Sequence, residues 1–108
     1  MNLKGKIAIV TGGTRDIGKA ISIKLAKEGA KVVVNYFSNE ANAKETLNAI
    51  KSDGGEAIIV KADVTKKSEV DRLVKEAVSS YGDAIDILVN NAGGLVARKT
   101  IAEMDEAF

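Results

Sequence analysis

The segment from Lys6 to Gly18, with the sequence KIAIVTGGTRDIG, carries the residue types that hold a phosphate group. A short apolar run leads into Gly12 and Gly13, and a helical pattern follows at once. Glycine lets the backbone turn without a Cβ in the way, and the first turn of a helix offers unpaired N–H groups and a positive dipole end to an anion. The segment therefore predicts a strand, a loop and a helix that hold the pyrophosphate of a dinucleotide. The alternative is a glycine turn that merely joins a strand to a helix.

The end of the second apolar run bears on the choice of coenzyme. Dinucleotide folds that prefer NAD place an acid there, roughly twenty residues past the first glycine, to hold the ribose hydroxyls. This chain has Asn35, which does not repel a 2′-phosphate, and Arg15 can pair with that phosphate as a planar charged fork. The pair predicts NADP as the cofactor. The alternative is that Asn35 caps a strand end and Arg15 is a solvated loop charge.

Two further groups of residues follow later apolar runs. Asp63 and Val64 come directly after the third, where a carboxylate can accept a hydrogen bond from an adenine amino group while valine packs against the ring. Asp63 could instead help to begin the next helix. The fourth run ends in NNAGG at 90–94, and such amides and small residues suit a backbone that approaches a flat ligand closely.

The elements that must position these residues alternate along the chain. Short, mostly β-branched runs predict strands covered on both faces, at 7–10, 32–34, 57–60 and 87–89. Between them, apolar residues at helical spacing predict three helices. The first helix has the apolar stripe Ile17, Ala20, Ile21 and Leu25 and ends before Gly29. The second has Ala43, Leu47 and Ile50 and ends before Gly54 and Gly55. The third has a stripe from Val70 to Tyr81, with Thr65 or Ser68 as N-cap and Gly82 at its end.

This alternation predicts an α/β fold with a Rossmann-type doubly wound parallel sheet. The sheet has about four strands in the order 3-2-1-4, which is incomplete for this fold. Its switch point lies between the first and fourth strands, so the crevice opens where Gly12 meets the end of the fourth strand. We find no linker or repeat, and residues 1–108 form one dinucleotide-binding portion.

Composition excludes several classes of function. The formal charge is +1, with Lys and Glu scattered along helix faces, which argues against nucleic-acid and membrane-surface binding. The absence of Cys and His excludes thiolate and imidazole chemistry and disulfides, and no metal site is expected. The apolar segment behind Lys4 and Lys6 is too short for a signal peptide or membrane span, so we expect a cytoplasmic protein.

Taken in order, TGGTRDIG at 11–18, DV at 63–64 and NNAG at 90–93 resemble the short-chain dehydrogenase/reductase family. The similarity runs from the first strand to the end of the chain. The VVVNY strand, Ser38 to Ala41 and Arg15 look most like bacterial 3-oxoacyl-acyl-carrier-protein reductases and related NADP-dependent carbonyl reductases.

The resemblance implies a set of cofactor-binding residues. These are Gly12, Thr14, Arg15, Ile17 and Gly18 around the phosphates and ribose, Asp63 and Val64 at the adenine, and Asn90, Ala92 and Gly93 on the path toward nicotinamide. Beside this set, we expect Asn35 to bear on coenzyme choice and Tyr36 to border the adenosine site. Asp16 departs from the pattern, since the family has glycine there, and its carboxylate should repel the phosphates. We hypothesise that Asp16 turns outward as an N-cap and weakens binding modestly.

The catalytic group that the resemblance implies is missing. Family members use a Ser, a Tyr and a Lys four residues after the Tyr, whereas Tyr36 and Tyr81 are followed at that distance by Glu40 and Ile85. We assign no catalytic residue. A capping-box pattern at Thr100 begins an apolar face that the chain does not complete, so the sequence reads as a front half whose catalytic part is absent.

Three hypotheses remain. The leading one is the cofactor-binding half of an NADP-dependent reductase, inactive alone, whose full-length form acts on a small-molecule or acyl-carrier-linked carbonyl. The second is a stand-alone nucleotide-binding or regulatory module. The third is a receiver-like signalling domain, which we rank last because such a domain needs clustered acids at the end of the first strand, where this chain has Thr11 and Gly12. An unpaired edge at the fourth strand predicts a homo-oligomer or marginal stability.

Overall fold

The computed structural model describes residues 2–12, 16–82 and 85–90. Strands and helices alternate along it: β1 (Ile7–Thr11), α1 (Asp16–Lys27), β2 (Lys31–Tyr36), α2 (Glu40–Ser52), β3 (Glu56–Lys61), α3 (Lys67–Tyr81) and β4 (Ile87–Asn90). All pairings are parallel, and the strand order is β3-β2-β1-β4. The fold class and the strand order predicted from the sequence are confirmed.

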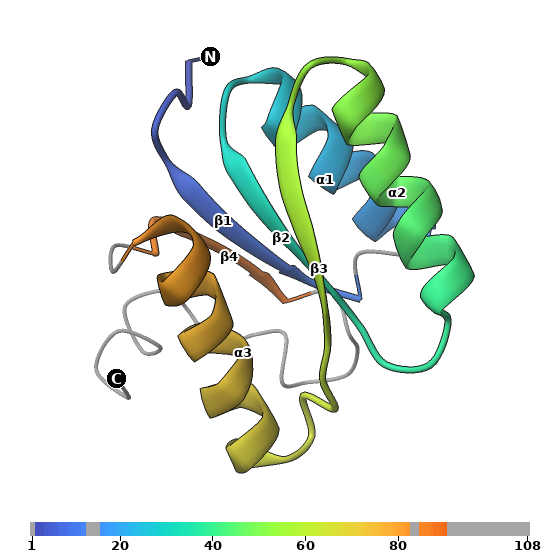
Figure 1. Cartoon of the computed structure of the whole chain (residues 1–108), viewed down its shortest axis with the longest axis vertical. Coiled ribbons are helices and arrows are strands. Elements are labelled where there is room, and N and C mark those ends of the chain that lie inside the picture. Colours follow the sequence, from blue (N-terminus) through green and yellow to red (C-terminus); the bar gives the residue numbers. More distant parts are fainter. Residues whose placement is uncertain (1, 13–15, 83–84, 91–108) are drawn as a thin grey trace.

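Helices cover both faces of the sheet, as Figure 1 shows: α1 and α2 lie on one face and α3 on the other. Successive residues of a strand point to opposite faces, so each strand supplies two cores. On β1, Ala8 and Val10 belong to the core under α1 and α2, while Ile9 belongs to the core under α3. This is why the runs are apolar without alternation.

The apolar stripe predicted for α1 is wrong in part. Ile17 is 67% exposed and Ala20 is also exposed. Ile21 and Leu25 of the stripe do pack against the core. The most buried positions are small residues one turn apart, Gly18, Ser22 and Ala26, and the Ser22 hydroxyl donates to the Gly18 carbonyl at 2.8 Å. Small side chains at this spacing let the helix lie close to the strands.

The start of α3 also differs from the prediction. Its N-cap is Lys66, which makes no side-chain capping bond, and neither Thr65 nor Ser68 has that role. The reason lies just before the helix, where the Asp63 carboxylate accepts hydrogen bonds from both the N–H and the hydroxyl of Thr65. This turn uses the Thr65 side chain and directs the chain into the helix two residues later.

The other helix ends follow the predicted glycines. Gly29, Gly54 and Gly82 all have positive φ, at +103°, +83° and +111°. Within the described ranges, no helix is both long and apolar enough to cross a membrane.

Candidate dinucleotide-binding site

The carboxyl ends of the four strands meet at one edge of the sheet, the lower edge in Figure 1, because all the strands are parallel. In register, Thr11 on β1 lies opposite Asn90 on β4, and Tyr36 on β2 lies opposite Lys61 on β3. The fold thus brings the ends of all the predicted motif strands to one edge. In open parallel sheets, ligands bind outside this edge at the switch point.

Gly12 turns the chain away from β1 at this edge. Its φ is +62°, in the left-handed region that residues with a Cβ rarely adopt. Its N–H donates to Oδ1 of Asn35, with a nitrogen to oxygen distance of 3.4 Å. Thr14 and Arg15 lie outside the described residues.

The first turn of α1 follows the loop directly. The helix begins at Asp16, so Asp16 is its first residue and not its N-cap, which corrects the capping hypothesis. A carboxylate in the first turn still favours the positive end of the helix dipole. Gly18 is buried, whereas Ile17 presents an open apolar side chain beside the loop.

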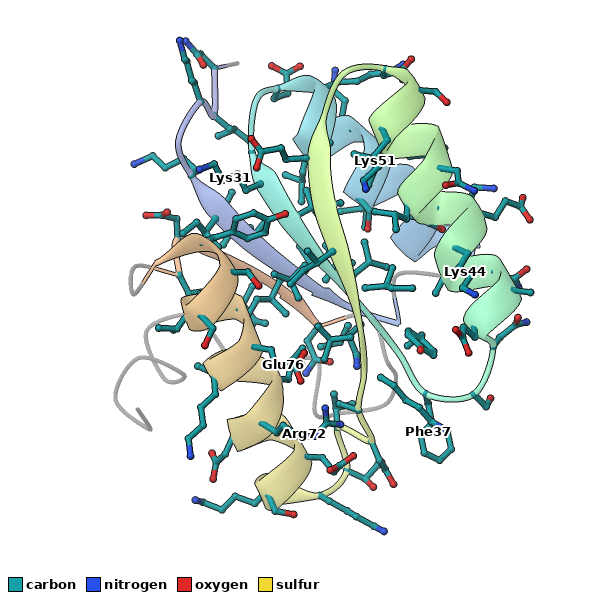
Figure 2. The ribbon with its side chains drawn as sticks, viewed as in Figure 1. Lys31, Phe37, Lys44, Lys51, Arg72 and Glu76 are labelled. Carbon is teal, nitrogen blue, oxygen red and sulfur yellow. The ribbon has the colours of Figure 1, made fainter. Side chains whose placement is uncertain are left out.

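Asn35 turns into the protein at the end of β2. The side chain is 2% exposed, and its Nδ2 donates to the carbonyls of Val60 at 3.3 Å and Ala62 at 3.1 Å. It therefore presents almost no surface to a ligand. The next two residues do present surface: Tyr36 is half-buried, and Phe37, in the loop at the same edge, is 62% exposed (Figure 2).

Thr11 and Asn90 join β1 to β4 at the switch point. The Thr11 hydroxyl lies 3.0 Å from Oδ1 of Asn90 and 3.3 Å from the Val89 carbonyl. Thr11 is 6% exposed, so this hydrogen bond links the two strand ends inside the protein. Ala92 and Gly93 lie outside the described residues.

Asp63 follows the end of β3, and one of its carboxylate oxygens already accepts hydrogen bonds. Its Oδ1 accepts the Thr65 hydroxyl at 2.6 Å and the Thr65 N–H at 3.0 Å. These two hydrogen bonds lower the pKa of Asp63, the bond from the hydroxyl having the larger effect, so the side chain is ionised at neutral pH. Val64 is half-buried and packs against the core under α3.

Sequence reasoning missed a charged network that supports this turn. Glu69 on α3 accepts the Asp63 N–H at 3.4 Å and pairs with Arg72 at 3.2 Å. Arg72, at the lower end of α3 in Figure 2, also donates to the Lys61 carbonyl. The Arg72 guanidinium, followed by the Asp63 N–H, lowers the pKa of Glu69. Only the helical spacing of Glu69, Arg72 and Glu76 could have indicated the network.

The two tyrosines lie at different edges of the sheet. Tyr36 ends β2 at the carboxyl edge, whereas Tyr81 ends α3 with its ring 5.7 Å from Nζ of Lys31, the first residue of β2. Tyr81 packs against the core under α3, as its place in the predicted stripe requires. In the part of the chain that the structure describes, no group of acidic side chains could hold a metal ion.

Comparison with known proteins identifies the family. A family model described as short chain dehydrogenase matches residues 6–108. The chain belongs to this family. Among curated relatives, a hydroxynaphthalene reductase-like protein, Arp2, of Metarhizium guizhouense is 50% identical over 92 residues, and the short-chain dehydrogenase/reductase homolog YusS of Bacillus subtilis is 49% identical over 92 residues.

Solved structures of the family share the fold. A short-chain dehydrogenase/reductase from Serratia marcescens superposes with a TM-score of 0.80 at 35% identity, and a hydroxysteroid dehydrogenase from Escherichia coli with 0.80 at 37%. The match covers 98% of this chain in both cases, but 44% and 46% of those chains. It covers 34% of the Metarhizium relative and 84% of the Bacillus relative. This short-chain dehydrogenase chain thus spans less than half of most of these relatives.

Proposed function

We propose that this chain binds NADP(H) as the coenzyme-binding portion of a short-chain reductase that moves hydride between nicotinamide and a carbonyl or alcohol carbon. The observation that carries the proposal is the meeting of Gly12, Asp63 and Asn90 at one sheet edge, with the first turn of α1 directly after the glycine loop. When bound, the coenzyme supplies the hydride. The residues of this chain bind and orient it.

Each strand end has a separate task in this proposal. The left-handed turn at Gly12 and the first N–H groups of α1 suit the diphosphate, because together they offer backbone donors and the positive helix end. The ionised Asp63 accepts a hydrogen bond from the adenine amino group with its remaining lone pairs. Asn90 holds the end of β4 against β1, on the path toward the nicotinamide.

Preference for NADP rests on the residues at and after the end of β2. Residues 35–39 read NYFSN, so no carboxylate stands where an acid would hold the ribose hydroxyls and repel a 2′-phosphate. Arg15 supplies the positive charge for that phosphate. The likeness of the VVVNY strand to 3-oxoacyl-acyl-carrier-protein reductases supports a small-molecule or acyl-carrier-linked carbonyl as the substrate of the full-length enzyme, and a reductase-like relative supports the reaction class.

Fluorescence titration of the chain with NADPH and NADH tests the proposal. We expect NADPH to bind more tightly by about tenfold, the worth of one charge-assisted phosphate contact. Arg15→Gln should remove that difference, whereas Lys27→Gln, which removes a positive charge from the far end of α1, should keep it. Equal affinity for the two coenzymes in the wild-type chain would refute the NADP preference, and no binding of either would refute the function.

A stand-alone nucleotide-binding module without catalysis is the second candidate. The observation that favours it is the Bacillus relative, since the 92 matched residues are 84% of that protein and leave little room in it for a further catalytic part. The coding sequence after Phe108 separates the two candidates. A reductase requires a downstream Ser and a Tyr-x-x-x-Lys pattern, and a binding module requires neither.

A further inference from the structure

Folds of this class place the residue that meets the ribose at the end of β2, where the sequence predicted a role for Asn35. In the structure β2 ends at Tyr36, and the Asn35 side chain is enclosed. It lies on β2 between the two neighbouring strands, in register with Val60 of β3. Only 2% of its surface is exposed. A side chain buried to this degree has no face left for a sugar hydroxyl, so its task must lie in the bonds that it makes inside the protein.

Those bonds reach both neighbouring strands. On one side, Oδ1 accepts the N–H of Gly12, where the chain leaves β1. On the other, Nδ2 donates to the carbonyls of Val60 and Ala62, at the end of β3. The partners fix the orientation of the amide, since Nδ2 faces carbonyl oxygens, that of Tyr36 at 3.4 Å included, and Oδ1 faces an N–H. A carboxylate could supply the acceptor but neither donor.

The two attachment points adjoin the two halves of the proposed coenzyme site. Gly12 begins the loop for the diphosphate, and Ala62 immediately precedes Asp63, which serves the adenine. We propose that Asn35 is a positioning residue that sets the spacing between the phosphate loop and the adenine turn, and that it does not contact the ribose. This inference rests on the proposed function, because it concerns the same site.

Substitution by Asp separates this role from direct contact. If Asn35 faced the ribose, Asn35→Asp would create the acid typical of NAD-binding folds and would tighten NADH binding. In the enclosed position, the carboxylate would meet the carbonyls of Val60 and Ala62 without a donor. We therefore expect Asn35→Asp to weaken the binding of NADH as well as NADPH.

The test measures both dissociation constants for the wild-type chain, Asn35→Asp, Asn35→Ala and two controls. Val33→Ala truncates a fully buried side chain of the same strand and controls for a general loss of stability. Asn48→Asp adds the same charge at an exposed position on α2. Compared at temperatures where each variant is equally folded, both Asn35 variants should lose about tenfold in affinity for each coenzyme, and the two controls should bind NADH like the wild type.

Two results would overturn the inference while leaving the proposed function intact. One is tighter NADH binding by Asn35→Asp, which would mean direct contact. The other is an Asn35→Ala variant that binds as well as Val33→Ala, which would mean a role in stability alone. If the wild-type chain bound neither coenzyme, the proposed function itself would fail, and this inference with it.

A measurement on the wild-type chain decides the matter if the Asn35 variants do not fold. The side-chain amide protons of Asn35 should exchange with solvent at least about tenfold more slowly than those of exposed Asn39. Titration with inorganic pyrophosphate should shift the Gly12 N–H and the Asn35 side-chain amide resonances together. Fast exchange at Asn35, or a shift at Gly12 alone, would contradict the positioning role.

Discussion

At the scale of single residues, Asp16 is the feature that most opposes the proposed function. A carboxylate at this position, in the first turn of α1, favours the helix dipole but repels a bound diphosphate. We expect Asp16→Asn and Asp16→Gly to tighten NADPH binding by about threefold at low ionic strength, and less at high salt. Calorimetric titration at two salt concentrations checks this.

The two substitutions separate charge from backbone freedom. Asn removes the charge and keeps the side chain, whereas Gly restores the residue typical of the family and frees the backbone. A shared gain in affinity means that charge is responsible. Unchanged dissociation constants in both variants would show that the carboxylate does not face the phosphates.

The sequence predicted which residues reach one edge of the sheet better than it predicted what their side chains do. Gly12, Asp63 and Asn90 reach one edge because each lies at or just after the end of a strand in a parallel sheet. Asn35 was predicted to bear on coenzyme choice, but its inward orientation depends on carbonyls at the end of β3 that lie far away in sequence. A single sequence carries no sign of such a partner.

At the scale of elements, the turn from β3 into α3 depends on Glu69. Its carboxylate holds the Asp63 N–H and the Arg72 guanidinium, which in turn holds the Lys61 carbonyl. We expect Glu69→Ala to loosen Asp63 and so to lower the preference for an adenine over a hypoxanthine dinucleotide by about threefold. Glu69→Gln keeps an acceptor and should retain most of the preference.

Comparative titration with NADPH and its hypoxanthine analogue gives this ratio directly. Glu45→Ala is the matched control, since Glu45 also forms an ion pair, 2.8 Å from Lys19, but lies on α2. It should leave the ratio unchanged. A similar change in both variants would show a general loss of stability in place of a local effect on Asp63.

The end of α3 carries a pH dependence of its own. Burial, followed by the nearby Glu56 carboxylate, raises the pKa of Tyr81 above its ordinary value. The phenol of the unfolded chain therefore ionises at a lower pH than that of the folded chain. The stability that comes from burying the neutral phenol is complete below about pH 10, the ordinary pKa of tyrosine, and is lost as pH rises through the higher pKa of the folded chain. Tyr81→Phe should make thermal stability less sensitive to alkali in this range.

Absorbance titration of the phenolate follows the same group directly. Glu56→Gln should lower the pKa of Tyr81 by removing the nearby negative charge, and Lys67→Gln, at the opposite end of α3, should not. An unchanged alkaline stability profile in Tyr81→Phe would contradict the assignment.

The helices differ in how far their sequences disclose their packing. The stripe on α3 was predicted correctly because large apolar residues such as Leu73 make its contact with the sheet. On α1, Ile21 and Leu25 of the predicted stripe pack against the core, but the most buried positions are Gly18, Ser22 and Ala26, and hydrophobic periodicity has no signal for small residues. The sequence therefore predicted the packing face of α1 only in part.

At the scale of the whole molecule, β4 is one of the two edge strands of the sheet that the structure describes. Among the strands that the structure describes, β4 pairs with β1 alone, and all its residues are half-buried. Leu88 packs against the core under α3, while Ile87 and Val89 pack against the core under α1 and α2. The interior strands β1 and β2, by contrast, are almost wholly buried.

We expect this edge to associate with another copy, since an edge strand with half-buried apolar side chains invites pairing. Light scattering coupled to size-exclusion chromatography should show a mass that rises with concentration, and the unfolding midpoint should rise with it. Leu88→Lys should lower the mass to that of a monomer, because an inward charge blocks edge pairing. Leu47→Lys, at a half-buried position on α2, should cost similar stability and leave association unchanged. A wild-type monomer at every concentration, with cooperative unfolding, would show that β4 is protected without a partner copy.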